Sequence, residues 1–265
     1  MNKPRKLAVS LLALEKKKDL IKFLEILNKE KIGYIELPIS KISKNYSYDE
    51  TKLAKFKNIL KEYSIKVSSI QSIFYNKNNW NIFDKKKHKF ILNHLTKIFR
   101  IAKYFSAKNI IFGSPKNRKF NKNDKEKDVL PFFNEVAKIA NKFDINFCIE
   151  PNARYYDCNY INNTDEAIKL VKLVNNKKFL INADTGNIFL EKDRCAAVKK
   201  NANLIANFQL SEKKLLSLSK GKINHLKILR NFTIKDQFIS LEMLNTNFFE
   251  LRKNIIKFKK ILSKV

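Results

Sequence analysis

Glycine, proline and cysteine are all scarce in this chain of 265 residues, which contains 4, 5 and 3 of them respectively. With so little glycine and proline, no stretch can serve as a flexible or proline-rich linker, so we expect one domain over residues 1–265. The odd, sparse set of cysteines (Cys148, Cys158 and Cys195) excludes a disulfide framework. Such a set is typical of a reducing compartment, and we therefore expect a cytoplasmic protein.

Long apolar runs are also missing. No run approaches the ~18 residues that a membrane-spanning helix needs, so no membrane partner is expected. Hydrophobic residues nevertheless make up 44% of the chain. That content excludes a disordered protein, and the length allows one large core.

Acidic residues are outnumbered, with 25 Asp and Glu against 55 Lys and Arg and a formal charge of +30. A charge of this size is found in proteins that bind nucleic acids or membrane surfaces. It also follows from a bias toward lysine, asparagine and isoleucine, whose codons are rich in A and T. The basic residues are spread through every predicted helix, which favours the second explanation, so no specific nucleic-acid partner is expected. A basic field would still attract a phosphorylated or acidic small substrate.

Residues 146–187 carry the clearest functional pattern. Two short apolar runs, 146–149 and 179–183, are followed directly by Glu150 and Asp184, and residues 164–176 between them have the pattern of a helix. A strand, a helix and a second strand, with an acid at each strand end, are typical of an active site on a parallel sheet. A carboxylate at that point needs a metal, a hydrogen bond or a counter-charge to offset its desolvation.

Short apolar runs alternate with helical patterns along the whole chain. The predicted strands are residues 7–14, 34–39, 66–75, 109–113, 146–149, 179–183, 204–211 and 238–244. The predicted helices are residues 19–31, 49–63, 86–105, 128–143, 164–176, 189–203, a short helix opened by His225, and 247–262. Such alternation implies parallel strands with right-handed crossovers, and eight units in this length predict an α/β protein, a single-domain (β/α)8 TIM barrel.

Four consecutive predicted strands end on oxygen-bearing side chains: Glu150, Asp184, Gln209 and Glu242. Chemistry in a TIM barrel collects at the C-terminal strand ends, so these side chains are expected at one mouth. Three carboxylates there would repel one another unless a cation joined them. Oxygen ligands suit a hard divalent metal ion, Mn²⁺ or Mg²⁺, which we expect as the cofactor. The alternative is separate ion pairs with lysines.

Six short motifs occur in order along the chain: IQS (70–72), FGSPKNR (112–118), IEPN (149–152), ADTGN (183–187), FQLSE (208–212) and SLEM (240–243). Together they resemble the xylose isomerase-like TIM barrel superfamily of sugar isomerases and epimerases, and within it the sugar phosphate isomerase/epimerase-like proteins. The resemblance implies a metal held by Glu, Asp, His and Glu, which fall on Glu150, Asp184, Gln209 and Glu242. It also implies that Glu150 and Glu242 exchange protons with the carbon next to a sugar carbonyl, through an enediolate.

The sequence departs from that pattern at Gln209, where the superfamily usually has histidine, and at Asn207, where a second histidine is frequent. An amide oxygen at Gln209 would give an all-oxygen site for Mn²⁺ or Mg²⁺. The same change is compatible with a non-catalytic sugar-binding barrel that has lost its metal. Lyase or dehydratase chemistry on a sugar acid stays open. An AP-endonuclease-like DNA-repair enzyme is disfavoured, because none of the histidines, His88, His94 and His225, ends a predicted strand of the cluster.

Polar residues near the strand ends are candidates for binding a sugar or sugar phosphate: Gln71, Lys116, Asn117, Arg118, Asn152 and His225. Lys116 and Arg118 could clamp a phosphate or sugar acid, and the amides suit sugar hydroxyls. The alternatives are a solvated basic loop, a surface histidine and polar side chains that cap backbone groups. For Glu36, a salt bridge is the favoured interpretation. A homo-oligomer is compatible with the sequence.

Overall fold

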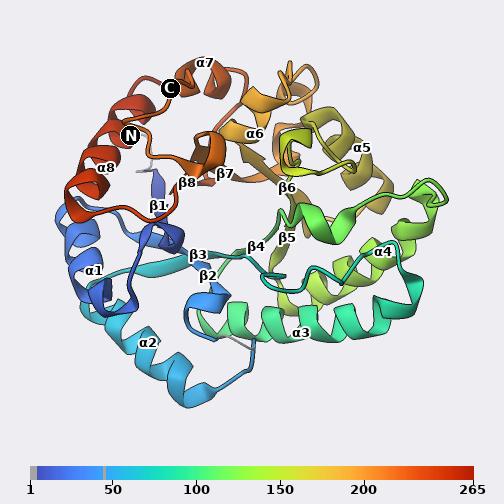
Figure 1. The fold of residues 1–265 in the computed structure, drawn as a ribbon, viewed down its shortest axis with the longest axis horizontal. Helices are drawn as coiled ribbons and strands as arrows, with labels where there is room; N and C mark the ends of the chain where they lie inside the picture. The colour runs from blue at the N-terminus through green and yellow to red at the C-terminus, as the bar shows by residue number, and fades with distance from the viewer. Residues whose placement is uncertain (1–4, 44–45) are drawn as a thin grey trace.

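Eight parallel strands form the centre of the molecule, and each pairs with the next along the chain (Figure 1). The computed structural model describes residues 5–43 and 46–265. The strands are β1 (Lys6–Ser10), β2 (Tyr34–Pro38), β3 (Lys66–Gln71), β4 (Asn109–Phe112), β5 (Asn146–Ile149), β6 (Phe179–Asp184), β7 (Ile205–Ser211) and β8 (Phe238–Glu242). Because β8 also pairs with β1, the sheet closes, and the predicted (β/α)8 TIM barrel is confirmed.

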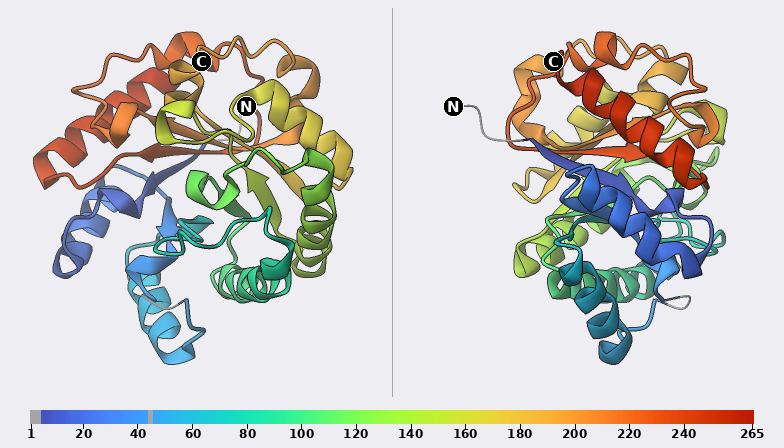
Figure 2. Two further views of the ribbon diagram at one scale, coloured as in Figure 1. Left: turned by 45° about the vertical axis from the view of Figure 1, so that its right-hand side comes forward. Right: turned by 90° about the vertical axis from the view of Figure 1, so that its left-hand side faces the viewer.

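Helices form an outer ring around the barrel (Figure 2). They are α1 (Leu20–Lys29), α2 (Glu50–Glu62), α3 (His88–Tyr104), α4 (Glu126–Phe143), α5 (Thr164–Val174), α6 (Thr185–Leu190), α7 (His225–Leu229) and α8 (Phe248–Leu262). In α3, Ile91, Leu95 and Ile98 recur at helical spacing and are fully buried, so one apolar stripe faces the core. Of the helices that the structure describes, none has the length and apolar character needed to cross a membrane.

Polar side chains occupy part of the barrel interior. Glu36, Ser69, Asn182 and Asn207 are fully buried although they come from four different strands. Apolar side chains fill the space between strands and helices, as where Phe179 of β6 packs against Phe133 of α4 with ring centroids 5.3 Å apart. The hydrophobic core therefore lies outside the sheet, and a polar interior leads to the barrel mouth.

β1 and β3 end well before the residues that the sequence predicts. β1 ends at Ser10, whose hydroxyl oxygen accepts a hydrogen bond from the backbone N–H of Leu12 and opens a 3-10 turn. β3 ends at Gln71, because the next residue, Ser72, adopts a left-handed φ of 55°. Both changes of direction occur at the C-terminal edge of the sheet, where the backbone must turn into a loop.

The helix predicted over residues 189–203 is wrong. α6 ends at Leu190, and the chain then adopts left-handed φ values of 52° at Lys192 and 51° at Cys195. The Asp193 carboxylate accepts hydrogen bonds from the backbone N–H groups of Thr164 and Cys195, at 2.7 and 2.8 Å. This side chain holds the segment against the start of α5, a tertiary contact that the apolar spacing does not reveal.

Candidate active site

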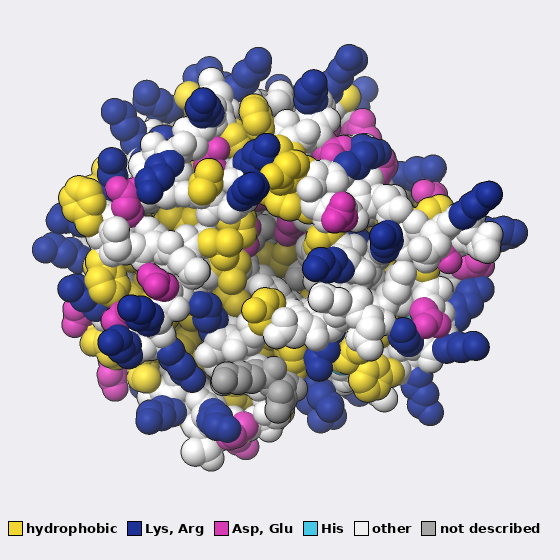
Figure 3. Space-filling view, in the orientation of Figure 1, with side chains coloured by type: hydrophobic (Ala, Val, Ile, Leu, Met, Phe, Trp, Pro, Cys, Tyr) yellow, Lys and Arg dark blue, Asp and Glu magenta, His cyan; other side chains and the backbone are white. Residues whose placement is uncertain are grey.

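A cavity of about 490 Å³ opens at the C-terminal ends of the strands, within the size range of small-molecule sites. Its lining includes Glu150, Asp184, Gln209 and Glu242, so the four predicted strand-end residues do meet in one place. Figure 3 shows a hollow at the centre of this face with acidic side chains inside and apolar side chains around it. Lys and Arg side chains are spread over the outer part of the same face.

Glu150, at the end of β5, is held by three side-chain amides. Its Oε1 accepts hydrogen bonds from Asn152 at 2.8 Å and Asn187 at 3.1 Å, and its Oε2 accepts one from Asn182 at 2.9 Å. Gly113 at the end of β4 gives the carboxylate room, because a Cβ there would lie 3.0 Å from Oε2. The carboxylate is therefore fixed in orientation and closely packed.

Burial raises the pKa of each acid in the cavity. Burial raises the pKa of Glu150 to about 8, and the negative charge of Asp184 adds to this. Burial, followed by the charges of Glu150 and Asp184, raises the pKa of Glu242 well above its usual range. The pKa of Asp184 is also raised by burial. With a pKa of about 8, Glu150 can exchange a proton near neutral pH, which suits acid–base chemistry.

Gln209 connects the acids through a chain of amides. Its Oε1 accepts a hydrogen bond of 2.5 Å from Asn182, the same amide that donates to Glu150. Its Nε2 donates to Glu36 at 2.8 Å and to Gln71 at 3.2 Å. Both polar atoms of Gln209 are thus engaged inside the barrel.

Glu36 on β2 is completely buried and does not line the cavity. It accepts hydrogen bonds from Ser69, Asn207 and Gln209, at 3.0, 3.0 and 2.8 Å. Burial raises its pKa, and these hydrogen bonds counteract that effect. The expected salt bridge is wrong: within the described part of the chain, Glu36 forms no ion pair, and neutral donors surround it instead.

Most of the oxygen atoms expected to bind a divalent ion already accept hydrogen bonds. Both Glu150 oxygens and Gln209 Oε1 accept side-chain hydrogen bonds, and Asp184 Oδ1 accepts one of 2.7 Å from the Asn187 backbone. Asp184 Oδ2 is buried without a partner among the described residues. No group of three His, Cys, Asp or Glu side chains in residues 5–43 and 46–265 is arranged to hold a metal ion. This arrangement does not fit a divalent ion.

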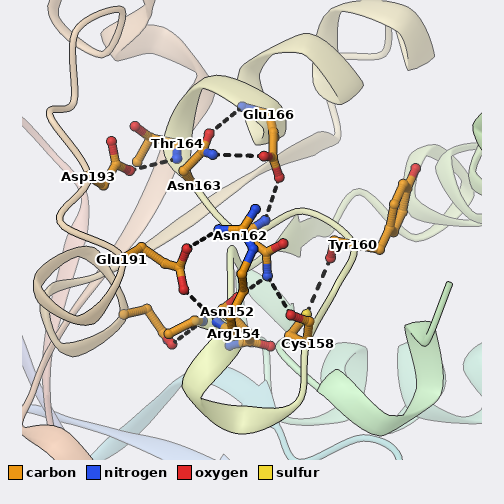
Figure 4. Close-up of polar contacts among 12 residues, drawn as sticks. Asn152, Arg154, Cys158, Tyr160, Asn162, Asn163, Thr164, Glu166, Glu191 and Asp193 are labelled. Carbon is orange, nitrogen blue, oxygen red and sulfur yellow. Dashed lines mark hydrogen bonds and ion pairs between the residues drawn. The ribbon is translucent and has the colours of Figure 1, made fainter.

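The loop after β5 is tied down by amide side chains (Figure 4). Asn162 donates from its amide to the backbone oxygens of Asn152 and Cys158, at 2.7 and 2.8 Å. Asn163 accepts a hydrogen bond from the backbone N–H of Glu166 and caps α5. Asn152 is held at the cavity by this loop.

Four of the six predicted substrate-binding residues line the cavity: Gln71, Lys116, Asn117 and Asn152. Lys116 is exposed, whereas the Asn117 amide donates to the backbone oxygens of Lys77 and Trp80 and holds two loops together. Lys116 has a free position from which to contact a ligand, and Asn117 has a mainly structural role.

The other two, Arg118 and His225, are buried and lie outside the cavity lining. Arg118 is completely buried and donates hydrogen bonds of 2.5 Å to the Glu150 backbone oxygen and the Asn152 side chain. His225 is also buried, and its ring nitrogens lie 2.9 Å from the Thr185 hydroxyl and 3.0 Å from the Glu212 carboxylate. Both side chains bond to residues near the strand ends and do not line the cavity.

Asn182 and Asn187 are the site residues that the sequence interpretation missed. Asn182 precedes Asp184 by two residues in β6, and residues two apart in a strand point to the same side. That alternation could have identified Asn182 as a neighbour of the site. Asn187 lies in the first turn of α6, where no comparable spacing rule applies.

A family model described as xylose isomerase-like TIM barrel matches residues 24–262. No curated protein sequence matches the chain. Among solved structures, D-psicose 3-epimerase from Clostridium cellulolyticum H10, solved with D-tagatose, has a TM-score of 0.77 at 14% identity and covers 98% of this chain and 100% of its own.

Two other solved structures are similar over nearly the same span. The IolI protein, solved with a bound zinc atom, has a TM-score of 0.72 at 18% identity, covering 97% of this chain and 96% of its own. The 3-keto-D-glucoside 4-epimerase YcjR from E. coli has a TM-score of 0.73 at 14% identity, covering 98% and 100%. At these identities the similarities establish a shared fold.

Proposed function

Because this chain belongs to the xylose isomerase-like TIM barrel family, we propose that it is a sugar or sugar-phosphate isomerase or epimerase. The observation that carries the proposal is the pair of carboxyl groups, Glu150 and Glu242, that line one cavity from different strand ends. The epimerases among its structural neighbours act on sugars, which supports the same substrate class here.

Epimerisation next to a carbonyl needs one carboxylate to remove a proton and one carboxylic acid to return it. The base takes the proton from the carbon beside the carbonyl, and the C–H electrons form an enediol or enediolate. The acid then donates a proton to the same carbon from the other face, or to the neighbouring carbon in an isomerisation. The charge of Glu150 adds to burial in raising the pKa of Glu242, so the two acids do not readily ionise together.

The cavity offers polar groups for the rest of a sugar. Gln71, Asn152 and Asn187 line it, and amides can bind hydroxyl groups as donors or acceptors. Lys116 at the exposed edge suits a phosphate group. A neighbouring hollow of about 770 Å³ shares Ser72, Tyr75 and Asn76 with the cavity and adds Lys41 and Lys77. These cations support a phosphorylated substrate over a neutral one.

Solvent proton exchange tests the proposal directly. Aldoses, ketoses and their phosphates would be incubated with the protein in D₂O and followed by NMR for loss of the proton next to the carbonyl. Reactions would be run with EDTA and, separately, with added Mn²⁺ or Mg²⁺, so that failure of catalysis is not confused with lack of an ion. Glu242→Gln should reduce exchange by about 10²- to 10⁴-fold, and Glu135→Gln on the exposed face of α4 should not.

A second candidate is a non-catalytic sugar-binding barrel. The engagement of both Gln209 polar atoms by Glu36, Gln71 and Asn182 favours it, because a buried amide network is also suited to rigid binding. Sugar binding without exchange, under every ion condition, would support this candidate and exclude the isomerase. The positions of the histidines disfavour a DNA-repair endonuclease. His88, His94 and His225 bond to Ile82, Ile73 and the Thr185–Glu212 pair instead of facing the cavity.

A further inference from the structure

The amide nitrogen of Asn182 lies between two of the oxygens that were expected to bind a metal. It is 2.9 Å from Glu150 Oε2 and 2.5 Å from Gln209 Oε1. Its own oxygen accepts a hydrogen bond of 2.7 Å from Asn207, which fixes the orientation of the amide. This donor on β6 joins an oxygen at the end of β5 to one on β7, and so takes the bridging position of a cation.

We infer that side-chain amides replace the divalent ion in this barrel and that the protein binds none at this site. Asn152, Asn182 and Asn187 together donate three hydrogen bonds to the Glu150 carboxylate, so both of its oxygens are engaged. The amide hydrogens carry partial positive charge and satisfy the buried carboxyl oxygens, a role that a cation would otherwise take. This property concerns ion binding alone and does not depend on which reaction the cavity performs.

A divalent ion would have to break this arrangement before it could bind. Mg²⁺ requires nearly octahedral oxygen coordination, and Mn²⁺ also prefers oxygen-rich sites. Freeing Glu150 Oε2 and Gln209 Oε1 would leave the Asn182 amide buried without an acceptor, a loss that is costly inside a protein. Releasing Gln209 Nε2 would likewise leave Glu36 with fewer donors, although Glu36 is completely buried.

The remaining expected ligands do not compensate. Asp184 uses Oδ1 to cap α6 through the Asn187 backbone, and only its Oδ2 is left unpartnered among the described side chains. Glu242 lines the same cavity as Gln71, whose amide donates to Ser10 and accepts from Gln209. The amides thus join the ends of β5, β6 and β7 into one network.

Metal content and thermal stability test the inference without any assay of activity. The intact protein, purified without chelator, should contain far less than one equivalent of Mn, Mg, Zn, Fe or Co by elemental analysis. Neither EDTA nor 1 mM Mn²⁺, Mg²⁺ or Zn²⁺ should shift its Tm. One equivalent of bound metal removed by EDTA with a fall in Tm, or a Tm rise on the order of 5 °C with an added ion, would overturn it.

Asn182→Asp tests the inference in the opposite direction, because it should create a site that binds a metal ion. The substitution keeps the oxygen that accepts from Asn207 but places a second carboxylate oxygen against Glu150 and Gln209, where a donor is needed. We expect this variant to lose several degrees of Tm in EDTA and to recover them with Mn²⁺, while exposed Asn141→Asp shows neither effect. A folded Asn182→Asp variant that ignores Mn²⁺ would contradict the idea that this amide stands where an ion would bind.

Discussion

Glu36 on β2 accepts a hydrogen bond of 2.8 Å from the side-chain amide of Gln209 on β7, although these strands are not neighbours in the barrel. The bond crosses the interior and fixes the orientation of Gln209, whose oxygen then faces Asn182. The buried carboxyl group of Glu36, which forms no ion pair among the described residues, therefore orients the amide network of the cavity.

Replacing Glu36 should strongly destabilise the protein, because three buried donors depend on its carboxyl group. Glu36→Ala leaves the donors of Ser69, Asn207 and Gln209 without their acceptor, and each unsatisfied buried donor costs about 1–3 kcal/mol. We expect a loss of about 3 kcal/mol or more in the free energy of unfolding, measured by urea denaturation. Glu36→Gln retains one acceptor and should lose less, and exposed Glu135→Ala should change stability by under about 0.5 kcal/mol. Equal losses for Glu36→Ala and Glu135→Ala would contradict this role.

The barrel can be predicted from the sequence because its strands and helices are each recognised from a short local pattern. Each strand is a short apolar run and each long helix an apolar stripe, so their alternation identifies the fold. The meeting of Glu150, Asp184, Gln209 and Glu242 also follows, because parallel strands place their C-terminal ends at one mouth.

The partners of these residues cannot be derived in the same way. Gln209 and Glu36 are 173 positions apart, and no local pattern connects them. Arg118 follows a strand and has the sequence context of an exposed loop. Its guanidinium is nevertheless buried and donates to the backbone oxygens of Gly113 and Glu150. Orientation and burial of this kind depend on the assembled barrel mouth.

Gly113 should be sensitive to the smallest addition of volume. A Cβ there would lie 3.0 Å from Glu150 Oε2 and 3.1 Å from Oε1, so Gly113→Ala must push the carboxylate away from its amide donors. We expect a loss of about 1–3 kcal/mol in stability, as for other overpacked sites, measured by urea denaturation. Gly33→Ala is the matched control, because nothing lies within 4 Å of its Cβ position and its φ is not positive. Destabilisation of both variants alike would show that crowding at Glu150 is not the cause.

Glu150 should make the protein less stable as the pH rises. Its pKa is raised from 4.5 to about 8, so between these values the folded state keeps a proton that the unfolded state has released. The stabilisation is complete below about pH 4.5 and is lost as the pH passes about 8. Asp184, Glu242 and Glu36 have raised pKa values and act in the same direction.

The pH effect is best measured above about pH 6.5. Below that value His94, whose pKa is lowered from 6.5 to about 4 by burial, makes stability rise with pH and opposes the acids. Urea denaturation in EDTA at pH 6.5 to 8.5 should show a declining free energy of unfolding for the wild type. Glu150→Gln has no carboxyl to titrate and should show a shallower decline, whereas identical slopes would place the titration elsewhere.

Lys116 should distinguish a phosphorylated substrate from a neutral one. It is exposed at the edge of the cavity, so its removal disturbs little packing, and its ammonium group is positioned for an anion entering the cavity. For a phosphorylated sugar, we expect Lys116→Ala to raise KM about 10-fold, equivalent to about 1.4 kcal/mol of lost binding, with kcat nearly unchanged. The neutral sugar should show no change, and neither should the exposed control Lys61→Ala near the end of α2. A KM that rises equally for the neutral sugar would show that Lys116 contacts hydroxyl groups and that the phosphate, if any, lies beside Lys41 and Lys77 in the neighbouring hollow.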